Sequence, residues 1–154
     1  MIFVCAMTMA QTNAYPLLPM PQNYKVTDKS FAMGKVKLST PVLKSEWEAF
    51  IVNAGGELAD KAAAEIKVEL LPVIDGVKLN PDEAYRLSVS GKLIKIEAVT
   101  ERGVYWALQT LRQLEKKKGK KSLFAGCEIV DWPAFRIRGF MQDVGRSYIS
   151  VEEL

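Results

Sequence analysis

The residues that could carry out chemistry are few, because this 154-residue sequence contains no histidine. Histidine-dependent chemistry is therefore excluded within the chain: Ser-His-Asp and Cys-His catalysis, HExxH zinc sites and imidazole acid–base steps. The pair Gly55-Gly56 lacks the spacing of phosphate-binding loops and predicts the end of a helix instead. No residues have the spacing of a metal site, so we expect no metal and no cofactor. The groups that could still carry out chemistry are carboxylates, arginines, aromatic side chains and the backbone.

Asp143 and Arg146 are the pair best placed to act on a ligand. They follow residues 138–143, which we predict to be a strand, and they precede the start of a helix. In barrels built from βα units, the loops at the C-terminal ends of the strands carry the functional side chains. An arginine there can donate paired hydrogen bonds to neighbouring sugar hydroxyls or to a carboxylate. The alternative is a local Asp–Arg ion pair that fixes the loop, and spacing alone favours neither.

The excess of positive charge comes from one segment of the chain. The net charge is +3, and five lysines lie within residues 116–121, so the rest of the chain is mildly acidic. We expect these lysines to form the solvated end of a helix, because a nucleic-acid-binding protein spreads its basic residues over a face or groove. The sequence therefore predicts no nucleic-acid partner. Cys5 and Cys127 cannot build a disulfide framework, and we expect Cys127 to be a small buried residue.

Residues 1–14 are typical of a partial signal-peptide leader. They begin with an apolar run, continue through Thr8-Met9-Ala10 and end in polar residues, which is the pattern at a small-residue cleavage site. The alternative is a short apolar strand. The leader predicts a secreted or periplasmic location. No apolar run reaches 18 residues, so we expect no membrane span.

Two amphipathic helices are expected. Ser45 and Glu48 fit a capping box, and the apolar residues that follow recur at helical spacing until Gly55-Gly56. Thr100 fits the N-cap of a second helix, whose C-terminal end would be the lysine-rich segment. The apolar stripe of the second helix is predicted to contain Val104, Ala107, Leu108, Leu111 and Leu114.

Period-2 alternation predicts the strands. Residues 85–89 and 94–98 alternate around Gly91-Lys92, which fits a hairpin with a type II′ turn. Further strands are expected at residues 35–39, 66–70 and 128–130. The predicted fold class is α+β: a small, mostly antiparallel sheet with two helices on one face, followed by the start of a truncated (β/α)8 barrel.

The end of the chain predicts a new structural unit. Ser150 and Glu153 fit a capping box, and the chain stops at Leu154, one turn into that helix. Strand, short loop and helix in this order form the first unit of a βα repeat. We therefore divide the chain into a leader (1–14), an N-terminal α+β domain (15–133) and the first strand and helix start of a barrel (134–154).

Two segments together resemble glycoside hydrolase family 20, the β-N-acetylhexosaminidases. Residues 131–146 read DWPAFRIRGFMQDVGR, similar to the D-x-P-R-F-x-x-R-G-x-x-x-D-x-x-R-H junction between that family's N-terminal α+β domain and its barrel. Residues 83–89 (EAYRLSV) and 102–114 (RGVYWALQTLRQL) are similar to its N-terminal domain. Two positions differ from the pattern: Ala134 replaces an arginine, and Ser147 stands where histidine is common.

The resemblance implies an exo-β-N-acetylhexosaminidase that removes terminal N-acetylhexosamine by substrate-assisted retaining hydrolysis. Arg146 would hydrogen-bond the sugar and Asp143 would support it, while the catalytic Asp-Glu pair would lie beyond Leu154, so the fragment alone is expected to be inactive. The expected partners are N-acetylhexosamine-containing glycans. The alternative is a stand-alone glycan- or protein-binding module without catalysis. Related glycosidases such as α-glucuronidases or O-GlcNAc hydrolases fit the D-x-x-R spacing of Asp143 and Arg146 less well.

Overall fold

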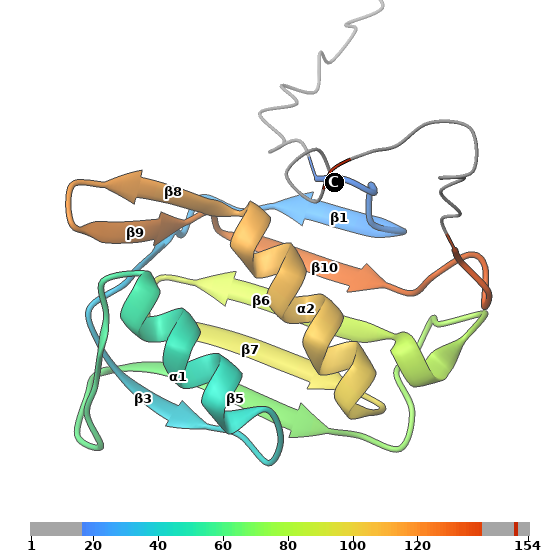
Figure 1. The fold of residues 1–154 in the computed structure, drawn as a ribbon, viewed down its shortest axis with the longest axis horizontal. Coiled ribbons are helices and arrows are strands. Elements are labelled where there is room, and N and C mark those ends of the chain that lie inside the picture. The colour runs from blue at the N-terminus through green and yellow to red at the C-terminus, as the bar shows by residue number, and fades with distance from the viewer. Residues whose placement is uncertain (1–16, 140–149, 151–154) are drawn as a thin grey trace, which may run out of the picture.

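The computed structural model describes residues 17–139 and residue 150. A seven-stranded sheet carries both α-helices on one face, and a three-stranded sheet lies beside its upper end (Figure 1). The elements in chain order are β1 (Asn23–Val26), β2 (Phe31–Ala32), β3 (Lys35–Ser39), α1 (Lys44–Asn53), β4 (Glu57–Leu58), β5 (Ala64–Leu70), the 3-10 helix η1 (Pro81–Glu83), β6 (Tyr85–Ser90), β7 (Leu93–Ala98), α2 (Glu101–Gln113), β8 (Glu115–Lys118), β9 (Lys121–Phe124) and β10 (Cys127–Asp131).

The large sheet is mixed, which corrects the prediction of a small, mostly antiparallel sheet. Its strand order is β1-β10-β6-β7-β5-β3-β4. The pairs β1–β10, β10–β6 and β6–β7 are antiparallel, whereas β7–β5, β5–β3 and β3–β4 are parallel. Helix α1 accounts for the parallel pairing of β3 with β4, because a helix that joins two neighbouring strands returns the chain to the same end of the sheet. The α+β class and the two helices on one face are confirmed.

The lysine-rich segment forms a hairpin and not the end of a helix. Helix α2 ends at Gln113, and β8 and β9 then pair from Glu115 to Phe124. Gly119, with φ of 64°, lies in the two-residue loop between Lys118 and Lys121. The three-stranded sheet has the order β2-β9-β8, so β8 is an edge strand. Charged residues on an edge strand oppose pairing with another chain, and they are compatible with this hairpin.

Helix α1 begins differently from the prediction. Leu43, with φ of 53°, is its N-cap and makes no side-chain capping bond, whereas Ser45 lies inside the helix and donates to Glu46. The predicted cap at Ser45 is therefore wrong. The predicted end is confirmed: Gly55 has φ of 76°, and the N–H of Gly56 donates to the Ile51 carbonyl in a Schellman motif (2.8 Å).

Helix α2 and the β6–β7 hairpin agree with the sequence. The Thr100 hydroxyl caps α2 by accepting a hydrogen bond from the Arg102 N–H (3.2 Å). The hairpin has the predicted two-residue loop, but Gly91 lacks the positive φ that a type II′ turn requires. Cys127 is buried as expected, and burial raises the pKa of its thiol to about 12. The predicted apolar stripe of α2 is buried at Val104, Ala107, Leu108, Leu111 and Leu114.

Several predictions concern residues outside the described part of the chain. They include the leader at residues 1–14 and most of the strand at 138–143, of which Arg138 and Gly139 are described and lie in no regular element. Asp143, Arg146 and the helix after Ser150 also lie outside it. The division at residue 133 and the start of a barrel therefore stay predictions.

Candidate functional site

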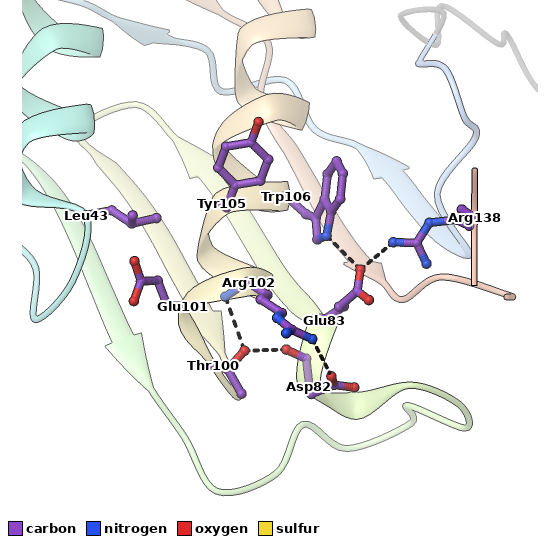
Figure 2. A pocket seen from close by; sticks show the side chains of 9 residues that line it. All are labelled: Leu43, Asp82, Glu83, Thr100, Glu101, Arg102, Tyr105, Trp106 and Arg138. Carbon is purple, nitrogen blue, oxygen red and sulfur yellow. Dashed lines mark hydrogen bonds and ion pairs between the residues drawn. The ribbon is translucent and has the colours of Figure 1, made fainter. Parts of the chain in front are cut away.

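An open groove of about 770 Å³ lies beside the N-terminal half of α2. Four segments meet there: the residue before α1, the 3-10 helix η1, the start of α2 and the chain that follows β10 (Figure 2). The lining residues are Leu43, Asp82, Glu83, Thr100, Glu101, Arg102, Tyr105, Trp106 and Arg138.

Glu83 is the buried charged residue of this groove, at 9% exposure. Its position depends on the 3-10 helix η1. The residue before η1, Asn80, has a left-handed backbone conformation (φ 44°), and Pro81 is the first residue of the helix. Proline suits that position because its φ is fixed near the helical value. The Glu83 carboxylate accepts a hydrogen bond from the Trp106 indole N–H (2.8 Å) and another from the Arg138 guanidinium (Figure 2).

The pKa of Glu83 lies below its ordinary value. Burial by itself raises the pKa of this carboxyl group, because desolvation disfavours the charged form. The hydrogen bonds from Arg138 and Trp106, with the positive charges of Arg138 and Arg102, more than offset that effect. Glu83 is therefore held as a carboxylate whose main partners are a cation and an indole.

Arg138 connects Glu83 to the chain that leaves the sheet. Its guanidinium donates to Glu83 and to the Phe135 carbonyl, and it lies 5.7 Å from the centre of the Trp106 ring. A guanidinium over an aromatic face is attracted by the ring's quadrupole. Each of these three residues thus contacts the other two. We call the set of Glu83, Trp106 and Arg138 the junction cluster.

Aromatic and charged side chains line the rest of the groove. Tyr105 packs edge-on against Trp106 at 5.2 Å between ring centres, and both rings are partly exposed. Arg102 pairs with Asp82 at 3.5 Å where both side chains are largely in solvent, so that pair contributes little stability. Among residues 17–139, no cluster of three His, Cys, Asp or Glu residues could hold a metal ion.

A second polar cluster lies between α2 and the large sheet. The Tyr85 hydroxyl shares a hydrogen bond with the Thr110 hydroxyl (2.6 Å) and donates to Asp131 (3.3 Å). Asp131 also accepts from the backbone N–H of Gln22 (3.0 Å). Burial raises the pKa of Asp131 and is the main cause of the raised pKa of Tyr85. We call these residues the interior cluster; it joins the residue before β1 to β10, β6 and α2.

The predicted site residues and the residues that line the groove come from different parts of the sequence. Asp143 and Arg146 lie outside the described residues, so their role stays a prediction. The sequence analysis did not single out Glu83, Trp106 or Arg138 as site residues. The residues that bond to Glu83 are 23 and 55 positions away in the sequence, so only the fold brings them together. None of the described helices is long and apolar enough to cross a membrane.

Comparisons with known proteins give the family. A family model described as glycosyl hydrolase family 20, domain 2, matches residues 14–132. A β-hexosaminidase of Porphyromonas gingivalis is 27% identical over 154 residues, covering 90% of this chain and 20% of that protein. A β-hexosaminidase of Vibrio furnissii is 34% identical over 95 residues, covering 62% of this chain and 15% of that protein.

Comparison with solved structures points to the same family. The family 20 exo-β-N-acetylglucosaminidase of Vibrio harveyi, crystallised with N-acetylglucosamine, has a TM-score of 0.66 and 32% identity, covering 90% of this chain and 22% of that one. The chain thus spans about a fifth or less of the length of these curated relatives. Because the family model matches more than half of the sequence, the chain belongs to glycosyl hydrolase family 20.

Proposed function

We propose that this chain is the N-terminal part of an exo-β-N-acetylhexosaminidase, which removes terminal N-acetylhexosamine from glycans. The observation that carries the proposal is the match of residues 14–132 to the second-domain model of family 20. The named relatives are β-hexosaminidases, and one related structure contains N-acetylglucosamine. The chain covers about a fifth of such proteins, so the catalytic residues are assigned to the part that follows.

The proposed reaction is substrate-assisted retaining hydrolysis, as the resemblance to the family implies. The oxygen of the substrate's 2-acetamido group attacks the anomeric carbon, and a glutamic acid donates a proton to the leaving oxygen. A neighbouring aspartate orients the acetamido group, and both acids are assigned to positions beyond Leu154. This chain would contribute Arg146, whose planar guanidinium can hydrogen-bond two sugar hydroxyls, with Asp143 as its support. We also propose secretion or a periplasmic location, on the basis of residues 1–14.

Activity measurements test this proposal directly. The reading frame after Leu154 should encode further βα units with an Asp-Glu pair, and the longer polypeptide should cleave an aryl N-acetylglucosaminide. The 154-residue chain should not cleave it. A frame that ends at Leu154 would favour the alternative, a binding module without catalysis. Hydrolysis by the 154-residue chain would contradict the assignment of the catalytic acids to the following part.

Arg146→Ala tests the proposed sugar contact in the longer polypeptide. Loss of a paired, charge-assisted hydrogen bond in a sugar pocket should lower kcat/KM by about 100-fold or more, with little change in Tm. The matched control is Arg112→Ala on α2. The exposed Arg112 guanidinium donates to the neighbouring Gln109 side chain (3.3 Å), so this variant should leave kcat/KM unchanged. Wild-type kinetics for Arg146→Ala would remove this residue from the site.

A further inference from the structure

The chain that follows β10 is fixed to η1 and its preceding turn at two points. The Asn80 side chain donates to the Pro133 carbonyl (2.7 Å), and Glu83 accepts from Arg138. Just before the first of these points, Trp132 is buried against Ile74 and Ala84, but the residues after it are not part of that core. One short turn, residues 80–83, therefore sets the direction in which the polypeptide leaves the α+β domain.

The fixed segment presents apolar side chains to solvent. Phe135 and Ile137 are 73% and 92% exposed, although they lie between the two points of attachment. A segment that only covered the end of the domain would bury such residues, because burial of a large apolar side chain stabilises the folded chain. Tyr105 and Trp106 in the adjacent groove are also exposed, at 45% and 40%.

The composition of this surface is that of a protein interface. Tryptophan, tyrosine and arginine are enriched among the residues that dominate binding energy, and polar residues surround them. Here Tyr105, Trp106 and Arg138 lie together, and the Arg102–Asp82 pair lies at the exposed rim. Phe135 and Ile137 lie in the same segment as Arg138. A domain attached to the end of this segment would therefore reach these two side chains and also the groove.

We propose that Glu83 anchors the exit of the polypeptide through Arg138, and that the groove beside it is the docking surface for the domain that follows in the same polypeptide. This rests on the proposed function, which supplies that domain. The occupant is a covalently attached domain and not a free glycan, because Arg138 and the exposed Phe135 and Ile137 lie on the chain that leads to it. Glu83 is a positioning residue in this proposal.

Trypsin tests the anchor in the 154-residue chain, because trypsin requires an arginine or lysine side chain to enter its specificity pocket. Arg136 and Arg138 are both exposed, but the Arg138 guanidinium is bound to Glu83 and lies over the Trp106 ring. We expect initial cleavage after Arg138 to be at least tenfold slower than after Arg136. Glu83→Gln should abolish this difference, while the control Glu101→Gln, in the same groove, should retain it.

Two further results complete the anchor test. Arg138→Lys retains a trypsin site and a positive charge but loses the guanidinium fork, so it should be cleaved several-fold faster than Arg138. This variant keeps the test valid if Glu83→Gln lowers stability, and circular dichroism would check that each variant is folded. Equal cleavage after Arg136 and Arg138 in the wild-type chain would overturn the anchor.

Hydroxyl-radical footprinting tests the docking surface. Oxidation of Tyr105 and Trp106 should be at least fivefold slower in the longer polypeptide than in the 154-residue chain. Leu58, which is 40% exposed in the edge strand β4, is the control and should be oxidised equally in both. Equal oxidation of Tyr105 and Trp106 in both proteins would overturn the docking surface.

The activity of the same longer polypeptide separates the two proposals. Hydrolysis of an aryl N-acetylglucosaminide with unprotected Tyr105 and Trp106 would overturn the docking surface alone. Protected side chains without hydrolysis would overturn the proposed function but support docking. A reading frame that ends at Leu154 would overturn both, because no following domain would exist.

Discussion

The junction cluster and the interior cluster each place a carboxylate against the same helix, yet their electrostatics are opposite. Trp106 of α2 donates to Glu83, and Thr110, one turn later, reaches Asp131 through the Tyr85 hydroxyl. Glu83 has a cation as partner and a pKa below its ordinary value. Asp131 has only neutral partners, and burial raises its pKa.

The difference reflects where each partner comes from. The interior cluster joins elements of the sheet and α2, so it is complete within the α+β domain. The junction cluster is completed by Arg138, seven positions after the end of β10 and outside every regular element. A hydrogen-bond network whose members all belong to the domain stabilises the domain itself. The Glu83–Arg138 ion pair instead stabilises the position of the chain that follows β10.

The largest effect should come from the residue that supports both clusters. Gly103 lets α2 approach η1, because a Cβ there would lie 2.2 Å from the Ala84 carbonyl oxygen. Gly103→Ala should lower the free energy of unfolding by about 3 kcal/mol, even though alanine favours helix by about 1 kcal/mol. Urea denaturation measures it, with Gly91→Ala as control, since nothing lies within 4 Å of a Cβ there. Equal losses in both variants would contradict the close-approach argument.

Asp131→Ala should have the next largest effect, because it breaks the interior cluster. The substitution removes the Asp131 acceptor of the buried Tyr85 hydroxyl and of the exposed Gln22 N–H. The expected loss in the free energy of unfolding is about 2 kcal/mol. Urea denaturation again measures it, and Asp75→Ala, at an exposed turn, should cost less than about 0.5 kcal/mol. Equal costs would show that the cluster does not stabilise the domain.

Glu83→Gln should cost less global stability than Asp131→Ala. The amide still accepts from Trp106, and Arg138 is partly exposed, so the lost charge-assisted bond is worth about 1 kcal/mol. Comparison of the two variants by urea denaturation sharpens the distinction between the clusters. A loss above about 3 kcal/mol would place Glu83 among the residues that hold the domain core together.

Local sequence signals predicted the elements whose stabilising contacts are also local. The β6–β7 alternation, the Thr100 cap and the apolar stripe of α2 are confirmed, because each depends on residues a few positions apart. The lysine-rich segment was assigned wrongly, since lysine suits both a helix end and an edge strand. The strand directions were also missed, because the alternation within a strand is the same in parallel and antiparallel pairs.

The groove could not be predicted in the same way. Glu83 and Arg138 were part of the segments that resemble the family, but nothing near Glu83 in sequence indicates a cation partner 55 positions later. Trp106 occupies the exposed side of α2, which the apolar stripe leaves undefined. The contact arises only when η1, α2 and the chain after β10 meet at one end of the strands (Figure 1).

The smallest effect is a pH dependence whose sign differs between the two carboxylates. The pKa of Glu83 is lowered in the folded chain, so its contribution to stability is full above about pH 4.3, its unfolded value, and is lost as pH falls through the folded pKa. The pKa of Asp131 is raised, so its contribution is full below about pH 3.9 and is lost as pH rises through the folded pKa. Relative to wild type, Glu83→Gln should therefore lose less stability as pH falls from about 6 to 3, whereas Asp131→Asn should lose more. Slopes of the same sign would contradict the assignment of a charged partner to one cluster and neutral partners to the other.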